Sequence, residues 1–279
     1  MSADALAARL GLRRRWRGAR SAVATGPGAL GAGVAMLWLT LIVLLPLAFV
    51  VAKASHAGLS GAWDVISDRE SFSALGLTVV ASLVVTAINV VVGTLTAWVL
   101  VRDAFPGKRV VNALIDLPFA MPTVVAGLTL LVLYGPDRPV GINLAFTRWS
   151  VVMAMLFVTL PFVVRSVQPV LIELDREVEE AASSLGAGSA ATLRRIVLPS
   201  LAPAIASGAA LAFARAVGEY GSLVLITGSI PFKTEVSSVL IVKSIENDLP
   251  VDAAVISTEL LAISVVILML LRAFGRPRA

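Results

Sequence analysis

The chain has 279 residues, of which 58% are hydrophobic and only 15% are charged, and its mean hydropathy is +0.91. A soluble domain carries roughly 25% charged residues, so this composition excludes an ordinary soluble enzyme, a disordered protein and a disulfide-stapled secreted domain. With no cysteine and one histidine, the sequence also excludes thiolate and multi-histidine metal sites. The net charge is +5. The apolar excess requires lipid as a second solvent.

Six stretches of the chain are long and apolar enough to cross a membrane. A helix needs roughly 20 apolar residues to span the hydrocarbon core. The runs are continuously apolar, which is typical of helices, whereas the strands of a barrel alternate in polarity. We therefore predict an all-α membrane protein with six transmembrane helices, over residues Ala32–Ala52, Ala74–Val101, Val111–Tyr134, Val151–Val170, Leu201–Ile226 and Ala253–Leu271.

Lys and Arg residues are distributed unevenly about these spans. If the N-terminal tail with its six arginines lies inside, the inner segments hold 16 of the 23 basic residues and the outer segments hold six. Because positively charged loops stay in the cytoplasm, both termini are predicted to be cytoplasmic. This distribution accounts for the basic net charge without nucleic acid. We divide the chain into an Arg-rich cytoplasmic tail over 1–30 and a transmembrane domain over 31–279.

Prolines lie within or near the ends of several spans. Each proline removes a backbone donor and is expected to kink its helix unless neighbouring helices satisfy the freed carbonyl. The densest case is Asp116–Pro122, near the inner end of the third span. Such kinks indicate either a bundle bent around a pathway or simple adjustments of packing.

The longest inner connection, residues 171–200, has the pattern of a helical hairpin. Its first part, Glu173–Leu185, predicts an acidic helix that ends at Gly186, a residue suited to a left-handed C-terminal cap. A second helix over Ser189–Val197 carries basic residues and is expected to stop at Leu198-Pro199. An exposed hairpin of this kind suits docking to a partner. The alternative is a solvated hairpin without a partner.

A specific motif lies within this loop. Glu180-Ala181-Ala182 is followed after three residues by Gly186, and after nine more by Ile196-Val197-Leu198-Pro199. This pattern resembles the EAA motif of ABC importer permeases at every fixed position. In that family the loop is the coupling helix that fits a groove in the ATPase subunit. By resemblance, Glu180 would make polar contacts at the ATPase surface, the alanines would allow close approach, and Gly186 would form the turn. The candidate ATPase-coupling residues are Glu180, Ala181, Ala182, Gly186, Ile196, Leu198 and Pro199.

The chain has no phosphate-binding loop of its own. The only Gly-Lys pair, Gly107-Lys108, lacks both the upstream glycine and the following hydroxyl of the GxxxxGK[ST] pattern. We therefore expect a transport subunit that is not an enzyme and binds no cofactor. ATP and Mg would be bound by the partner ATPase.

Three further segments narrow the resemblance. Asp116–Thr129, Pro161–Leu171, and Phe213–Gly221 followed by Phe232–Val236 resemble the corresponding segments of sulfate/thiosulfate permeases of the CysT type. That family has the MetI-like type I ABC importer fold and lies in the bacterial cytoplasmic membrane. The resemblance implies three kinds of partner: a CysA-type ATPase dimer, a CysW-type second permease, and a periplasmic or lipid-anchored sulfate-binding protein.

The fifth predicted span carries an unusual charge, Arg215. A charge inside a membrane span is costly and indicates function by default. Glu219 lies four residues on and can pair with it. Either Arg215 faces the pathway and offers its planar donors to a tetrahedral oxyanion, or the two residues form an internal ion pair that holds helices in register. Thr123 and Ser222 complete the candidate substrate pathway because their hydroxyls could bind an oxyanion, although polar packing residues are common in membrane bundles.

Other interpretations remain open. The stretch around Arg215 is shared with molybdate permeases, so the importer could carry molybdate, tungstate or another oxyanion. A stand-alone channel or secondary carrier is a further alternative, and it predicts that transport survives loss of any ATPase. Lys233 and Lys243 fall in the predicted outer loop, where ordinary solvated lysines are the simpler interpretation.

Overall fold

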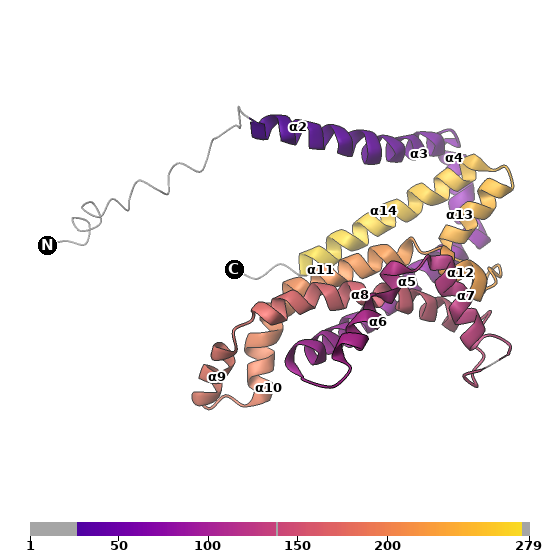
Figure 1. Ribbon diagram of the computed structural model, residues 1–279. Coiled ribbons are helices and arrows are strands. Elements are labelled where there is room, and N and C mark those ends of the chain that lie inside the picture. Colours follow the sequence, from indigo (N-terminus) through magenta and orange to yellow (C-terminus); the bar gives the residue numbers. More distant parts are fainter. Residues whose placement is uncertain (1–26, 138, 275–279) are drawn as a thin grey trace, which may run out of the picture. The chain divides into compact units, whose positions relative to one another are not determined.

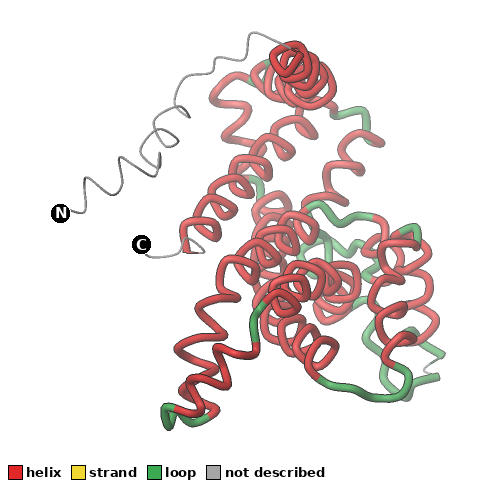
Figure 2. The backbone as a smooth tube through the Cα atoms, turned by 60° about the vertical axis from the view of Figure 1, so that its left-hand side comes forward, coloured by secondary structure: helices red, strands yellow, loops and turns green. Residues whose placement is uncertain are grey.

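The computed structural model describes residues 27–137 and 139–274, and these residues form helices joined by short loops (Figure 2). The chain divides into two units, residues 1–52 and 53–279. Most of the Arg-rich tail predicted over 1–30 lies outside the described residues. The first unit contributes an apolar helix formed by α2 (Pro27–Leu39), a π-helical turn η2 (Thr40–Leu44) and the start of α3 (Leu45–Ser55).

The larger unit is a bundle built around the helix α8 (Arg148–Glu173), which packs against α5, α6, α7, α11 and α12 (Figure 1). Its elements in chain order are α4 (Gly58–Ser67), α5 (Arg69–Arg102), α6 (Lys108–Ala120), α7 (Thr123–Tyr134), α8 (Arg148–Glu173), α9 (Arg176–Ser184), α10 (Ser189–Thr192), the π-helical turn η3 (Leu193–Val197), α11 (Leu198–Val217), α12 (Gly221–Ile226), α13 (Ser237–Glu246) and α14 (Pro250–Phe274).

Glycines allow α5 and α11 to approach α8 closely. A Cβ atom added at Gly93 of α5 would lie 2.9 Å from the Cβ of Val163, and one added at Gly208 of α11 would lie 2.9 Å from the Cα of the same valine. A buried hydrogen bond reinforces the first contact, since the Asn89 side-chain amide donates to the Thr159 hydroxyl at 2.7 Å. Small residues and shared polar contacts are how helices associate without a hydrophobic driving force.

The membrane-spanning helices agree with the predicted all-α class. Five described helices are long and apolar enough to cross a membrane, or six if α6 and α7 together make one broken span. The third span, predicted over Val111–Tyr134, is two helices whose axes differ by 117°. Met121 and Pro122 between them are extended, because the residue before a proline is pushed out of the helical region. The sequence therefore predicted the position of the kink but not its angle.

The fifth span differs from its predicted bounds. Sequence reasoning placed one helix over Leu201–Ile226, but α11 ends at Val217 and α12 begins only at Gly221. The predicted stop at Leu198-Pro199 is also wrong, since the helix continues from the second half of the hairpin into α11. Pro199 is the second residue of α11 and therefore lies inside this continuous helix.

Two π-helical turns accommodate two of the prolines, Pro46 and Pro199. Each turn ends two residues before a proline, η2 before Pro46 and η3 before Pro199. The N–H of Leu45 donates to Thr40 O, and that of Leu198 donates to Leu193 O, so the chain makes i→i−5 bonds at these points. A wider turn relieves the clash between a proline ring and the carbonyl four residues earlier. The helices thus continue past Pro46 and Pro199.

The larger unit has two distinct ends. The hairpin, defined here as α9, the turn at Gly186 and α10, projects from one of them, which we call the hairpin end (Figure 1). The loop over 227–236, α12 and α13 gather at the opposite end (Figure 1). Helix α5 reaches from the opposite end, where it begins at Arg69, to the hairpin end, where Arg102 contacts α9.

Candidate functional site

The hairpin is built by local capping. Asp175 caps α9, because its side chain accepts a hydrogen bond from the N–H of Glu177 at 2.9 Å. At the other end of α9, Gly186 adopts a φ of +86°, and its N–H donates to Ser183 O at 2.9 Å. The predicted glycine turn between two helices is therefore confirmed. The first helix, however, begins at Arg176, because α8 extends to Glu173 and takes up the start of the predicted one.

The structure places the seven candidate coupling residues in two groups. Glu180, Ala181 and Gly186 are exposed on the hairpin, with Ala182 half-buried beside them. The remaining three lie around η3 at the base of the hairpin, where Ile196 is half-buried and Leu198 and Pro199 are exposed. Leu185 is 89% exposed at the tip. A small, apolar tip flanked by a carboxylate suits insertion into a groove on another protein.

An ion pair that sequence reasoning missed ties the hairpin to α5. Arg102, the last residue of α5, donates a hydrogen bond to the Glu179 carboxylate of α9. The Arg102 side chain is only 10% exposed and its guanidinium lies 5.6 Å from the centre of the Trp98 ring. The available signal in the sequence was Arg102 at the very end of an apolar span, where a basic side chain can extend to the membrane interface and meet a polar group.

The junction between α11 and α12 brings together three of the four candidate pathway residues. Arg215 Nη2 lies 2.8 Å from Glu219 Oε2, an ion pair without the geometry of a hydrogen bond. The Glu219 side chain is fully buried, whereas that of Arg215 is 34% exposed. The other carboxylate oxygen accepts hydrogen bonds from the backbone N–H and the hydroxyl of Ser222, at 2.9 and 2.8 Å. The predicted pairing of Arg215 with Glu219 is therefore present.

The fourth residue, Thr123, reaches this junction through a close contact between α7 and α12. A Cβ atom added at Gly221 would lie 2.2 Å from Thr123 Oγ1, and one added at Gly127 would lie 2.5 Å from the carbonyl oxygen of Ser222. The first turn of α7 therefore lies directly against the start of α12. The Thr123 side chain is half-buried and Ser222 is buried. Residues from two spans that are about 100 positions apart meet at one site.

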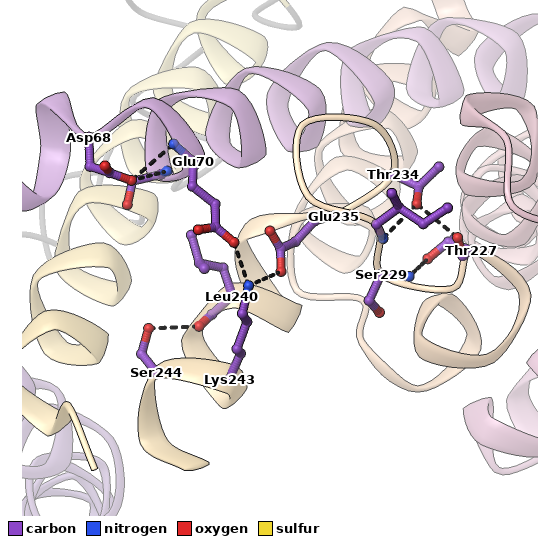
Figure 3. Close-up of polar contacts among 11 residues, drawn as sticks. Asp68, Glu70, Thr227, Ser229, Thr234, Glu235, Leu240, Lys243 and Ser244 are labelled. Atoms are coloured by element: carbon purple, nitrogen blue, oxygen red, sulfur yellow. Dashed lines mark hydrogen bonds and ion pairs between the residues drawn. The ribbon is translucent and has the colours of Figure 1, made fainter. Parts of the chain in front are cut away.

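The opposite end of the larger unit holds a second ion-pair cluster that sequence reasoning missed (Figure 3). Lys243 of α13 points between two carboxylates, donating a hydrogen bond to Glu70 and another of 3.2 Å to Glu235. Lys243 was expected to be an ordinary solvated lysine, and this expectation is wrong because α5 and the 227–236 loop bring both carboxylates against it. Burial raises the pKa of Glu235 to about 7, against the lowering effect of Lys243.

Comparison with known proteins decides the family. Residues 89–276 match the family described as "Binding-protein-dependent transport system inner membrane component". The chain belongs to this permease family. Among curated relatives, a "Sulfate transport system permease protein CysT" from Synechocystis sp. is 46% identical over 254 residues, which cover 87% of this chain and 88% of the relative. The CysT protein of Escherichia coli strain K12 is 42% identical over 245 residues, covering 85% and 88%.

Solved structures show the same fold in other permeases. A chain from the crystal structure of a bacterial ABC transporter involved in the import of the acidic polysaccharide alginate superposes with a TM-score of 0.72. It covers 89% of this chain and 95% of its own length at 15% identity. A chain of an inward-facing MetNI methionine ABC transporter gives a TM-score of 0.50 at 19% identity, covering 74% and 91%. The expected MetI-like permease fold of the CysT type is therefore confirmed.

The match to the permease family covers the hairpin and the α11–α12 junction. The hairpin and the α11–α12 junction lie within residues 89–276, whereas the Glu70 side of the Lys243 cluster lies before them. Among the described residues, no group of three or more His, Cys, Asp or Glu side chains is arranged to hold a metal ion. The chemistry that these permease residues offer is hydrogen bonding and ion pairing.

Proposed function

We propose that this chain is the membrane permease subunit of an ATP-driven importer for sulfate or thiosulfate. The observation that carries the proposal is the exposed hairpin, in which the EAA pattern places Glu180, Ala181 and the Gly186 turn at an accessible surface. The relatives named as sulfate transport permeases over more than four fifths of the chain support the choice of anion. The chain contributes translocation and performs no covalent chemistry.

The hairpin would dock into a groove of the partner ATPase. ATP and Mg bound by that ATPase would drive its closure, which would push the hairpin and switch the helices between inward- and outward-facing arrangements. A CysA-type ATPase dimer, a CysW-type second permease and a periplasmic or lipid-anchored sulfate-binding protein are the partners that we infer. We place the complex in the bacterial cytoplasmic membrane, with both termini and the hairpin in the cytoplasm.

The anion would pass the α11–α12 junction. Arg215 is the cation of this site, and about a third of its side chain is accessible although Glu219 already pairs with it. A guanidinium presents planar donors that match an oxyanion, and nearby hydroxyls could add hydrogen bonds. Because Glu219 neutralises part of the Arg215 charge, the site would bind a dianion weakly. Weak binding would let the anion leave the site and complete its transport. The alternative role of Arg215 and Glu219 is purely to hold α11 and α12 together.

Uptake in cells tests the proposal. Cells that lack this chain should lose uptake of radiolabelled sulfate, regain it with the intact gene, and keep it in the presence of excess unlabelled molybdate. Unchanged sulfate uptake would overturn the choice of substrate, and inhibition by molybdate would favour an importer of molybdate or tungstate. Uptake that survives removal of the partner ATPase would indicate a channel or secondary carrier.

A matched pair of glycine variants tests the coupling role. Gly186 and Gly188 are both exposed and have open space around them, but only Gly186 has a positive φ. Gly186→Trp should abolish uptake and release the ATPase from the complex, because it changes both the turn and the docking surface. Gly188→Ala should leave both unchanged. Normal uptake by Gly186→Trp would contradict docking of the hairpin.

A further inference from the structure

Helix α5 joins the two ends of the larger unit. It is 34 residues long, so it extends over about 50 Å at 1.5 Å per residue. Its first turn carries Glu70 and its last residue is Arg102, and each of these charged residues forms an ion pair with a separate element. Such a helix is a rigid body that can pass a displacement from one end to the other.

At the hairpin end the link is a nearly buried charge. Helix α9 is connected by the chain to α8 and α11, whereas its link to α5 is the Arg102–Glu179 pair. Trp98 of α5 lines a crevice of about 320 Å³ together with Ser183 and Thr192 of the hairpin, so space remains between the two elements there. The pair therefore attaches α9 to the end of α5 at one point. The crevice beside it leaves space for the rest of the hairpin to shift. Breaking a pair of this kind leaves a charge poorly solvated, which makes the contact persistent.

At the opposite end, polar contacts join α5 to α13, and a further hydrogen bond joins α13 to the candidate pathway site. Thr78 of α5 accepts a hydrogen bond from the Ser237 N–H at 2.8 Å, about two helical turns along α5 from Glu70, which pairs with Lys243. The next residue, Ser238, donates from its hydroxyl to the backbone carbonyl of Glu219 at 2.6 Å. Hydrogen bonds of the adjacent residues Ser237 and Ser238 thus link Thr78, in the third turn of α5, to the backbone of Glu219, the residue that pairs with Arg215.

We propose that α5 transmits the displacement of the hairpin to the α11–α12 junction, with Arg102 and Glu179 as positioning residues at one end and Ser238 at the other. This inference rests on the proposed function, because it takes the hairpin as the element that the ATPase moves. Coupling between distant sites requires an element whose position both ends bias, and α5 has polar attachments at both.

The experiment uses the whole complex purified through a tag on this chain. Because the natural chain has no cysteine, Gly218→Cys introduces a single thiol at the exposed end of α11. The rate of its reaction with a maleimide is measured without nucleotide and with a non-hydrolysable ATP analogue. In the otherwise unchanged chain the analogue should alter this rate by about fivefold or more, the lower end of typical coupling effects.

Three variants then test the link. Glu179→Gln and Ser238→Ala should each reduce the nucleotide effect on labelling to less than about twofold while the ATPase still copurifies. The charge-exchanged variant Arg102→Glu with Glu179→Arg should restore the effect, because it re-forms the pair. Glu177→Gln, on the exposed face of the same helix, should behave like the natural residue.

The outcomes separate this proposal from the function on which it rests. A full nucleotide effect in Glu179→Gln would overturn transmission through α5. Loss of the ATPase from that variant would also overturn it, since Glu179 would then act in docking. If Gly186→Trp leaves the ATPase bound and uptake normal, the proposed function itself fails, whatever the labelling shows.

Discussion

Gly186 is the residue on which the hairpin turn depends. Its φ of +86° lies in the left-handed region, which costs about 1–2 kcal/mol for a residue with a side chain. We expect Gly186→Ala to increase the rate of amide hydrogen exchange in α9 by about fivefold or more, since about 1 kcal/mol is lost locally. Gly188→Ala, at a φ of −72°, is the control and should change nothing. Equal exchange rates in the two variants would show that the turn does not depend on glycine.

Glu235 should make stability depend on pH. Its pKa is about 7 instead of 4.5, because burial disfavours the carboxylate. The folded chain therefore binds more protons than the unfolded chain between these values, and its free energy of unfolding falls as pH rises from about 5 to about 8. Glu235→Gln should flatten this dependence in thermal unfolding of the detergent-solubilised protein, whereas Glu246→Gln at an exposed site should not. A slope of the opposite sign would contradict the assignment.

Variants of Arg215 can distinguish its two proposed roles, which are binding of the anion and formation of a structural ion pair. Removing the cation in Arg215→Gln leaves the fully buried carboxylate of Glu219 without its ion-pair partner, which should cost about 3 kcal/mol of stability. The double variant Arg215→Gln with Glu219→Gln should recover most of that stability in thermal unfolding. If it also recovers sulfate uptake, the pair is structural. If uptake stays absent in a stable protein, Arg215 contacts the anion.

At the scale of elements, the contact of α7 with α12 leaves no room for an added side chain at its glycines. Gly127→Ala would place a methyl group 2.5 Å from the Ser222 carbonyl oxygen, so one helix must move. Overpacking of this kind costs about 1–3 kcal/mol and should lower the midpoint of thermal unfolding. Gly76→Ala in α5 faces open space and should leave the midpoint unchanged or raise it slightly. An unchanged midpoint in Gly127→Ala would mean that the two helices are not held at this distance.

Sequence patterns predicted where the helices lie more accurately than where they end or bend. The Asp116–Pro122 segment indicated a kink, and the structure turns it into a 117° break because Met121 and Pro122 are extended. The predicted stop at Leu198-Pro199 failed, since η3 lets the helix pass its proline. Local rules treat proline as a terminator, whereas a widened turn and packing of the flanking helices decide whether it ends the helix.

At the scale of the whole molecule, the orientation in the membrane is open to a direct test. The natural chain has no cysteine, so Gly188→Cys in the hairpin and Lys233→Cys at the opposite end each provide a single exposed thiol. Because the positive residues favour a cytoplasmic hairpin, a membrane-impermeant maleimide should label Lys233→Cys in intact spheroplasts and Gly188→Cys only after permeabilisation. The reverse pattern would invert the predicted topology and rule out docking of the hairpin to a cytoplasmic ATPase.

The amino-acid sequence by itself determined the solvent, the helical class, the family and the hairpin with its glycine turn. These follow from hydropathy, from local backbone preference and from a motif of 20 residues, all of which act over short distances along the chain. Only the tertiary structure brought Thr123 against Gly221, paired Arg102 with Glu179, and set Lys243 between Glu70 and Glu235. Those contacts join residues far apart in sequence, and a charge finds its partner through the packing of helices, which no local pattern encodes.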